Sequence, residues 1–298
     1  REKDPHMKIG TRLPGFAREI GFEGYCAWLS ENDFDAVDTP ALTAEVAKTC
    51  QRYGLEIGTC DAGAGGLLSK DAAKRRKALS ELKKQLTAMA KHGGHTYFTV
   101  LGPDDGNMPR AETFEIFKKV YPKVVEHAEK VGINIAIEPW PGGSPRLPNL
   151  GCSPESLRRI FEAIPSPNLG ICYDPSHFVR LQIDHMRLLH EFSDRVHHVH
   201  LKDTEINQEK LYESGIAGES YSHSYGFGEG WWRYTIPGEG IVDWQQLLRR
   251  LEEYGYDGVL SVELEDHHFW ATPELQQEGL IRSRDYIGQF LKADDDDA

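Results

Sequence analysis

The most constraining feature of this chain is a repeated order of amphipathic helix, glycine and short apolar strand. Phe114, Phe117 and Tyr121 recur at helical spacing, Gly132 follows them, and residues 133–137 form a nearly continuous aliphatic run. Glycine readily adopts the left-handed conformation that ends a helix, and such a run is typical of a parallel strand buried on both faces. The same order recurs with its glycines at Gly54, Gly93, Gly94 and Gly255. The pattern predicts an α/β protein.

Eight candidate strands alternate with these helices. They are residues 8–11, 24–29, 55–60, 96–100, 133–137, 169–173, 196–201 and 259–262. Helix starts are expected at Thr39-Pro40, Ser153-Pro154 and Thr272-Pro273, where an N-cap oxygen precedes a proline. Eight strands favour a closed (β/α)8 TIM barrel. A doubly wound open sheet is the alternative, but no GxGxxG turn follows the first strand.

The length of 298 residues suits one barrel domain, expected over residues 7–292. Residues 1–6 and 293–298 are expected to be tails or residues added for expression. No internal linker divides the chain. The longest irregular stretch, residues 204–240, is rich in Gly, Tyr and Trp, and we expect an ordered insertion after the seventh strand.

Composition excludes several classes of protein. The net charge of −13 disfavours binding to nucleic acid or to anionic membrane surfaces. No apolar run approaches the roughly 18 to 20 residues of a membrane span. The five cysteines form no CxxC pair, which favours small buried side chains in a reducing, cytoplasmic compartment.

Ionisable residues end four of the later strands. Glu138 ends one strand, Asp174 follows the next, His198 and His200 lie in the third, and Glu263 and Glu265 follow the last. Active sites of parallel barrels form at the carboxyl ends of the strands. Buried carboxylates gathered there would repel one another unless a cation neutralised them. Two Glu, one Asp and one His would suit a divalent ion, Mn²⁺ first and Mg²⁺, Co²⁺ or Zn²⁺ as alternatives.

Each position has a competing interpretation. A strand-end aspartate such as Asp174 often caps a helix, so a single position is weak evidence for a ligand. His198 and His200 lie on the same face of their strand, and either could reach the centre. Glu263 and Glu265 are also two residues apart, so either of them could reach the centre. An arginine or lysine occupying the centre would argue against a metal site.

The motifs Ile-Glu-Pro, Tyr-Asp-Pro-Ser-His, His-Val-His-Leu-Lys-Asp and Ser-Val-Glu-Leu-Glu-Asp, in this order, resemble those of the sugar phosphate isomerase/epimerase family of xylose isomerase-like TIM barrels. The similarity extends over residues 8–291 and includes the Gly-Glu-Gly-x-Val-Asp-Trp segment at residues 238–244. The resemblance implies that the metal is held by Glu138, Asp174, His200 and Glu263, and that His177 lies close to the substrate. Glu265 would then support Glu263 or bind substrate.

Other residues carry two interpretations. Trp140, Trp231 and Trp232 could stack on a sugar ring or pack within the insertion. Lys202 could bind substrate oxygens or neutralise nearby carboxylates. We expect His198 to support the site from behind and His197 to be structural, and we expect His267 and His268 to border the site or lie on the surface.

The resemblance implies a small sugar as substrate and an isomerase or epimerase that removes a proton next to a carbonyl. Glu138 and Glu263 would share the proton transfer. The alternative is a lyase or dehydratase that eliminates a leaving group from a 3-keto-glycoside or an inosose. A barrel that only binds sugar is a third possibility, and the acidic charge argues against the related abasic-site endonucleases. A homo-oligomer or a partner subunit is a further expectation from the family.

Overall fold

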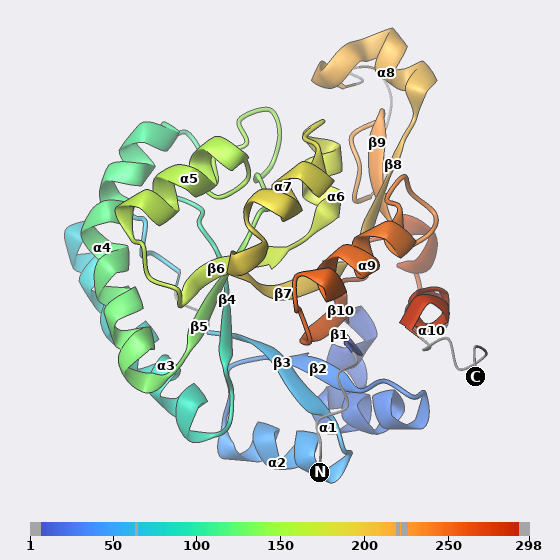
Figure 1. The fold of residues 1–298 in the computed structure, drawn as a ribbon, viewed down its shortest axis with the longest axis horizontal. Helices are drawn as coiled ribbons and strands as arrows, with labels where there is room; N and C mark the ends of the chain where they lie inside the picture. Colours follow the sequence, from blue (N-terminus) through green and yellow to red (C-terminus); the bar gives the residue numbers. More distant parts are fainter. Residues whose placement is uncertain (1–6, 63–64, 219–220, 222–225, 292–298) are drawn as a thin grey trace.

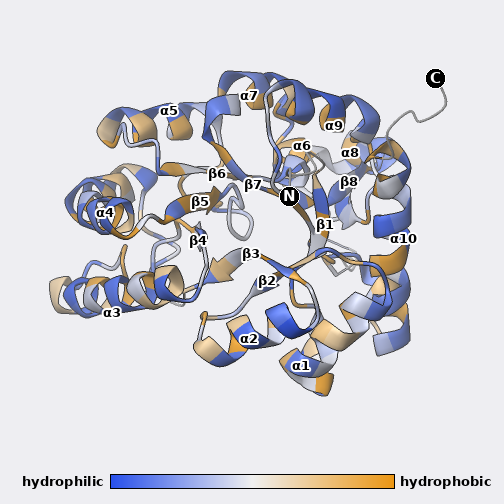
Figure 2. Ribbon diagram, turned by 60° about the horizontal axis from the view of Figure 1, so that its bottom comes forward, coloured by the Kyte–Doolittle hydropathy of each residue, from blue (hydrophilic) through white to orange (hydrophobic). Residues whose placement is uncertain are grey.

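The computed structural model describes residues 7–62, 65–218, 221 and 226–291. Eight parallel strands close into a barrel inside a ring of helices, so the TIM-barrel prediction is confirmed (Figures 1 and 2). In their order around the barrel the strands are β1 (Lys8–Thr11), β10 (Val259–Val262), β7 (Val196–Leu201), β6 (Leu169–Tyr173), β5 (Asn134–Glu138), β4 (Thr96–Val100), β3 (Glu56–Asp61) and β2 (Ala36–Thr39). The expected tails at residues 1–6 and 293–298 lie outside the described residues.

The helices surround the barrel (Figure 2). In order they are α1 (Gly15–Glu31), α2 (Ala44–Arg52), α3 (Ala72–Lys91), α4 (Arg110–Val131), α5 (Pro154–Ala163), α6 (Pro175–Arg180), α7 (His185–Glu191), α9 (Trp244–Glu253) and α10 (Pro273–Leu291). In helix α9, for example, Trp244, Leu247, Leu248 and Leu251 are buried at helical spacing. No helix in the described part of the chain is long and apolar enough to cross a membrane.

The strand predicted at residues 24–29 is wrong, because these residues belong to helix α1. Tyr25, Cys26 and Leu29 are buried there on one helical face, and a short apolar run of this kind fits either a strand or a buried helix. The true second strand is β2, which is only four residues long and contains the buried acid Asp38. Its polar residue concealed it from the hydrophobic pattern.

One of the three predicted helix starts is also wrong. Thr39 ends strand β2, and helix α2 is capped instead by Thr43, whose hydroxyl accepts from the Val46 N–H at 3.2 Å. The prediction at Ser153 is confirmed, because its side chain caps α5 and proline follows. Thr272 likewise accepts from the Leu275 N–H at 3.3 Å at the start of α10.

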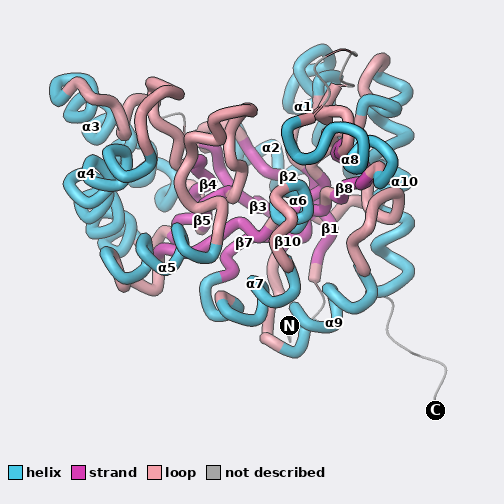
Figure 3. Tube along the Cα trace, turned by 90° about the horizontal axis from the view of Figure 1, so that it is seen from above, coloured by secondary structure: helices cyan, strands magenta, loops and turns pink. Residues whose placement is uncertain are grey.

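The insertion after β7 projects from the rim of the barrel (Figures 1 and 3). Its antiparallel strands β8 (Asp203–Ile206) and β9 (Trp232–Thr235) flank the short helix α8 (Gln208–Ser214). The described part is ordered around a small core of its own, formed by Trp231, Trp232 and Tyr234. Residues 219–220 and 222–225 of the predicted insertion lie outside the described residues.

A single carboxylate joins the two ends of the insertion. Buried Asp203 accepts hydrogen bonds from Gly238 N at 3.2 Å, from Val242 N at 3.1 Å and from Trp244 Nε1 at 2.8 Å. A Cβ atom on Gly240 would come within 2.1 Å of Asp203 Oδ1, so glycine is required there. This clamp gives the Gly-Glu-Gly-x-Val-Asp-Trp segment a structural role.

Candidate active site

The four predicted metal ligands meet at the carboxyl end of the barrel. Glu138 ends β5, Asp174 directly follows β6, His200 lies near the end of β7 and Glu263 directly follows β10. The side chains of Glu138, Asp174 and His200 are buried, while that of Glu263 is 18% exposed. The parallel register of the strands therefore gathers residues that are as many as 125 positions apart in the sequence.

Their oxygen and nitrogen atoms converge on one volume. His200 Nδ1 lies 3.2 Å from Glu138 Oε2, 3.3 Å from Glu263 Oε2 and 3.7 Å from Asp174 Oδ2. Donors placed tetrahedrally about 2.0–2.2 Å from one ion are separated by roughly 3.3–3.6 Å. The distances from His200 Nδ1 are therefore compatible with a shared divalent cation, and the three carboxylates also group with His177, which offers an alternative nitrogen ligand.

Three of these four atoms, Glu138 Oε2, Asp174 Oδ2 and His200 Nδ1, are buried and make no hydrogen bond to any described residue. Glu138 Oε2 and His200 Nδ1 also face each other. A buried polar atom without a partner costs about 1–3 kcal/mol. A cation bound between them would satisfy both atoms, so the donor set fits a metal.

Asp174 serves two purposes at once. Its Oδ1 atom caps helix α6 by accepting from the Ser176 N–H at 2.9 Å and from the Ser176 hydroxyl at 2.6 Å. Its Oδ2 atom turns toward His200 and Lys202. The helix-cap interpretation of Asp174 is therefore confirmed for Oδ1, and the metal-ligand interpretation stays a prediction for Oδ2.

The Lys202 ammonium borders the same cluster. It lies 3.1 Å from Asp174 Oδ2 and 3.0 Å from Glu265 Oε2, and it donates to Glu263 Oε2. Lys202 therefore neutralises nearby carboxylates, as one of its two interpretations predicted. It makes no hydrogen bond to Glu138 Oε2 or His200 Nδ1, so the lysine does not satisfy the whole donor set.

The charges in the cluster shift its acids and its base in opposite directions. Burial alone raises the pKa of Glu138 and Glu263, but His200 lowers the pKa of both, and Lys202 lowers that of Glu263 further. Burial alone lowers the pKa of Lys202, but the surrounding carboxylates hold it well above its ordinary value. Glu138 and Glu263 are therefore ionised and Lys202 is protonated at neutral pH.

His177 contacts Glu138 directly, and its place beside a substrate stays a prediction. Its Nε2 atom lies 2.7 Å from Glu138 Oε1, and its Nδ1 atom lies 2.7 Å from the hydroxyl of Tyr234. Tyr234 belongs to strand β9 of the insertion and also accepts from Arg180 Nη1 at 3.2 Å. The sequence analysis identified neither Tyr234 nor Arg180.

Arg12 is a further residue that the sequence analysis missed. It follows β1, its Nε atom lies 3.1 Å from Glu263 Oε1 in an ion pair, and its Nη2 atom donates to Asp61 Oδ2 at 3.0 Å. Its guanidinium lies 4.1 Å above the centre of the Phe98 ring, and its Nη1 atom is buried without a partner among the described residues. The strand-end rule, applied to the first strand, would have found it.

A second buried layer lies behind His200. Asp38 Oδ2 accepts from the Ser261 hydroxyl at 2.7 Å and contacts His198 Nε2 at 3.2 Å, while Asp38 Oδ1 accepts from the Thr59 N–H at 2.7 Å. His200 Nε2 is 3.9 Å from Asp38 Oδ2. His198 thus takes the supporting place expected for it, and the misassigned second strand concealed Asp38.

The tryptophans divide into two groups. Trp140 is 40% exposed beside the end of β5, whereas Trp231 and Trp232 are buried in the insertion. The guanidinium of Arg180 lies 4.3 Å above the centre of the Trp232 ring. Trp231 therefore packs within the insertion, and Arg180 covers one face of Trp232. The stacking of Trp140 on a substrate stays a prediction.

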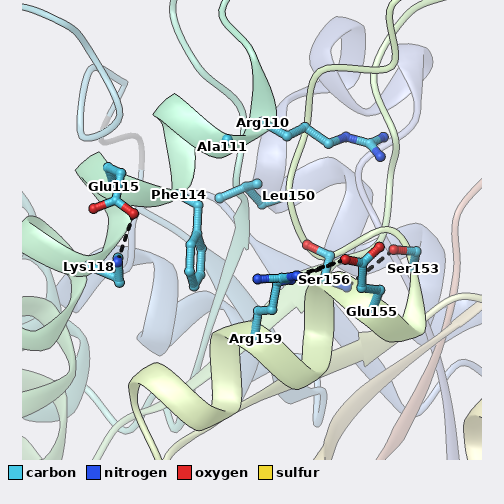
Figure 4. Close-up of a pocket in the computed structure, with 10 residues that line it drawn as sticks. All are labelled: Arg110, Ala111, Phe114, Glu115, Lys118, Leu150, Ser153, Glu155, Ser156 and Arg159. Atoms are coloured by element: carbon cyan, nitrogen blue, oxygen red, sulfur yellow. Dashed lines mark hydrogen bonds and ion pairs between the residues drawn. The ribbon is translucent and has the colours of Figure 1, made fainter.

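The remaining predicted histidines lie outside the cluster. His197 Nε2 bonds to the Pro167 carbonyl at 3.0 Å, in agreement with a structural role. His267 and His268 line a pocket of about 300 Å³ together with Trp232 and Arg233. A second pocket, of about 420 Å³, lies between α4 and α5, and no predicted site residue lines it (Figure 4).

Comparisons with known proteins agree with the barrel fold. A family model described as the xylose isomerase-like TIM barrel matches residues 14–286. An inosose dehydratase from Geobacillus thermodenitrificans is 30% identical over 134 residues, which cover 45% of this chain and 42% of that protein. The chain thus spans less than half of the length of this curated relative.

Two solved structures illustrate the similarity of fold. Mannonate dehydratase from Streptococcus suis serotype 2 matches with a TM-score of 0.73 and 13% identity, over 97% of this chain and 93% of that one. The 3-keto-D-glucoside 4-epimerase from E. coli matches with a TM-score of 0.68 and 18% identity, over 95% and 99%. At these identities the likeness concerns the fold.

Proposed function

Because the chain belongs to the xylose isomerase-like TIM barrel family, we propose that it is a divalent-metal-dependent isomerase or epimerase acting on a ketose or keto-sugar derivative. The observation that carries the proposal is the convergence of Glu138, Asp174, His200 and Glu263, with two facing donor atoms left unpartnered. The reaction is proton removal next to a carbonyl.

Glu138 Oε2, Asp174 Oδ2, His200 Nδ1 and Glu263 Oε2 would hold the ion. Mixed oxygen and nitrogen donors of this kind suit Mn²⁺ well. When bound, a divalent cation polarises a carbonyl oxygen and stabilises the negative charge that develops as the neighbouring proton leaves.

The chain itself supplies the groups that move protons. Glu138 ends β5 and Glu263 follows β10, two strands that β6 and β7 separate, so their carboxylates would approach a substrate from different directions. In an epimerisation one carboxylate would remove the proton and the other would return a proton to the opposite face. Arg12 and Lys202 hold Glu263 in place from two sides.

Elimination is the second candidate, favoured by the sequence similarity to inosose dehydratase and by the proton donors in the site. Loss of a hydroxyl or a glycoside after proton removal needs an acid that protonates the leaving group. The Lys202 ammonium lies among the carboxylates and could serve as that acid. An inosose or a 3-keto-glycoside would be the substrate.

The test is to incubate the Mn²⁺-loaded protein in D₂O with ketoses, an inosose and 3-keto-glycosides. Deuterium next to the carbonyl in an epimerised product supports the isomerase, whereas a dehydrated product or a released aglycone supports the lyase. The Glu138→Gln variant should lose either activity. A wild-type protein that binds Mn²⁺ but exchanges no proton in any of these substrates would contradict both.

The setting of the enzyme is also a proposal. The cysteines of the described chain, Cys26, Cys50, Cys60, Cys152 and Cys172, are free and buried, which suits a reducing cytoplasm. A small sugar would be its main partner, together with a second copy of the chain or another subunit. Size measurement in solution tests the assembly.

A further inference from the structure

A buried chain of hydrogen bonds connects the insertion to Glu138. It runs from Arg180 Nη1 to the Tyr234 hydroxyl at 3.2 Å, from that hydroxyl to His177 Nδ1 at 2.7 Å, and from His177 Nε2 to Glu138 Oε1 at 2.7 Å. All four residues are at most 5% exposed. In such surroundings each proton must find an acceptor.

Arg180 sets the direction of this chain at its first end. A guanidinium only donates hydrogen bonds, so Tyr234 must accept from it. The guanidinium is itself held by the Gly142 carbonyl at 3.2 Å, by Glu229 Oε1 at 3.2 Å and by the face of Trp232. The single hydroxyl proton of Tyr234 is therefore directed to His177 Nδ1, which acts as the acceptor.

His177 Nε2 contacts two groups at the other end. It lies 2.7 Å from Glu138 Oε1, which would accept from a protonated Nε2, and 3.4 Å from the Lys202 ammonium, which would donate to a bare Nε2. This end therefore admits either tautomer, and only the Nε2–H form leaves Nδ1 free to accept the buried hydroxyl proton of Tyr234.

We propose that Tyr234, oriented by Arg180, is a positioning residue that fixes the Nε2–H tautomer of His177. In this tautomer His177 occupies Glu138 Oε1 and leaves Glu138 Oε2 turned toward His200 Nδ1, which lies 3.2 Å away. The insertion thus determines which oxygen of Glu138 is available to bind a cation. Any effect of Tyr234 on catalysis rests on the proposed function, whereas the tautomer of His177 can be measured without it.

The direct test is ¹⁵N NMR on metal-free, ¹⁵N-histidine-labelled protein, with His177→Asn used to identify the signals of His177. Wild type should show a bare Nδ1 and a protonated Nε2. Tyr234→Phe should give a mixture of tautomers, because phenylalanine offers no proton to Nδ1. Tyr212→Phe is the matched control, since Tyr212 is 88% exposed on the same insertion, and it should resemble wild type.

A protonated Nδ1 in wild type, or an unchanged tautomer in Tyr234→Phe, would overturn the proposal. Arg180→Met provides a second variant if Tyr234→Phe does not fold. It keeps the tyrosine but removes the donor that orients its hydroxyl, so it should also mix the tautomers.

Calorimetric titration with Mn²⁺ alone gives an independent readout. Tyr234→Phe should bind Mn²⁺ more weakly than wild type, by less than the roughly 10- to 100-fold that usually follows loss of a residue bonded directly to a metal ligand, such as His177. Tyr212→Phe should bind normally. If the proposed reaction is wrong, no variant will turn over sugar, while the NMR and Mn²⁺ results still decide the role of Tyr234.

Discussion

His200 Nδ1 and Glu138 Oε2 lie 3.2 Å apart, and neither atom has a hydrogen-bond partner among the described residues. An imidazole nitrogen and a carboxylate oxygen placed in this way can both be satisfied by one cation. The predictions below concern metal binding, the charged side chains of Lys202 and Arg12 near the site, and the stability of the insertion.

The first prediction concerns metal binding. His200→Asn should weaken Mn²⁺ binding by at least about 100-fold, because one of four donors is lost from a fixed cage. His197→Asn is the matched control on the same strand, since His197 bonds to a backbone carbonyl away from the cluster. Calorimetry measures both, and equal affinities for His200→Asn and wild type would contradict the site.

The second prediction concerns Lys202. Lys202→Met should bind Mn²⁺ at least about tenfold more tightly, since the ammonium repels a second cation and competes for Asp174 Oδ2 and Glu263 Oε2. Lys84→Met, at a side chain that is 74% exposed, should leave the affinity unchanged. Weaker Mn²⁺ binding by Lys202→Met would instead mean that the lysine holds the carboxylates in their binding geometry.

The third prediction concerns Arg12, which holds Glu263 and carries an unpartnered buried Nη1. Arg12→Met should lower kcat/KM for the sugar about 100-fold, because Glu263 loses a fixed orientation and the substrate loses a donor. Steady-state kinetics measure the change. The control Arg52→Met removes a surface ion pair with Glu23 and should turn over normally. Unchanged kinetics in Arg12→Met would exclude Arg12 from the site.

The fourth prediction concerns the stability of the insertion. Asp203→Ala should lower the free energy of unfolding by about 3 kcal/mol, because several buried donors lose their acceptor together. Denaturant unfolding measures the loss. Asp194→Ala, which removes a 78%-exposed carboxylate, should change it by less than about 0.5 kcal/mol. A similar small change in Asp203→Ala would show that the clamp is dispensable.

The sequence predicted the barrel and the convergence at its carboxyl end because both follow from local pattern. A strand of aliphatic residues that ends in Glu138 or Glu263 needs no tertiary information to be recognised. The side chains then meet because every strand runs in the same direction. This reasoning failed at β2, where a four-residue strand with the buried acid Asp38 carries almost no hydrophobic signal.

Contacts between residues far apart in the sequence could not be predicted from hydrophobic periodicity or short motifs. Tyr234 lies 57 residues after His177, in an irregular stretch, and no periodicity connects the two. The position of the Lys202 ammonium likewise depends on the side chain's rotamer and on Glu265, Glu263 and Asp174 around it. Local sequence therefore left two roles for Lys202 open, and the packed structure was needed to place its charge.

The Asp203 clamp has a consequence for how this barrel can diversify. Because Asp203 holds the first and last residues of the insertion together, the segment between them can change in length or sequence without displacing the barrel strands. Such an insertion is a natural unit for transplantation between barrels. If Tyr234 has the proposed positioning role, a replacement insertion must still place a hydroxyl next to His177 Nδ1. The insertion and the barrel would then depend on each other through this one contact.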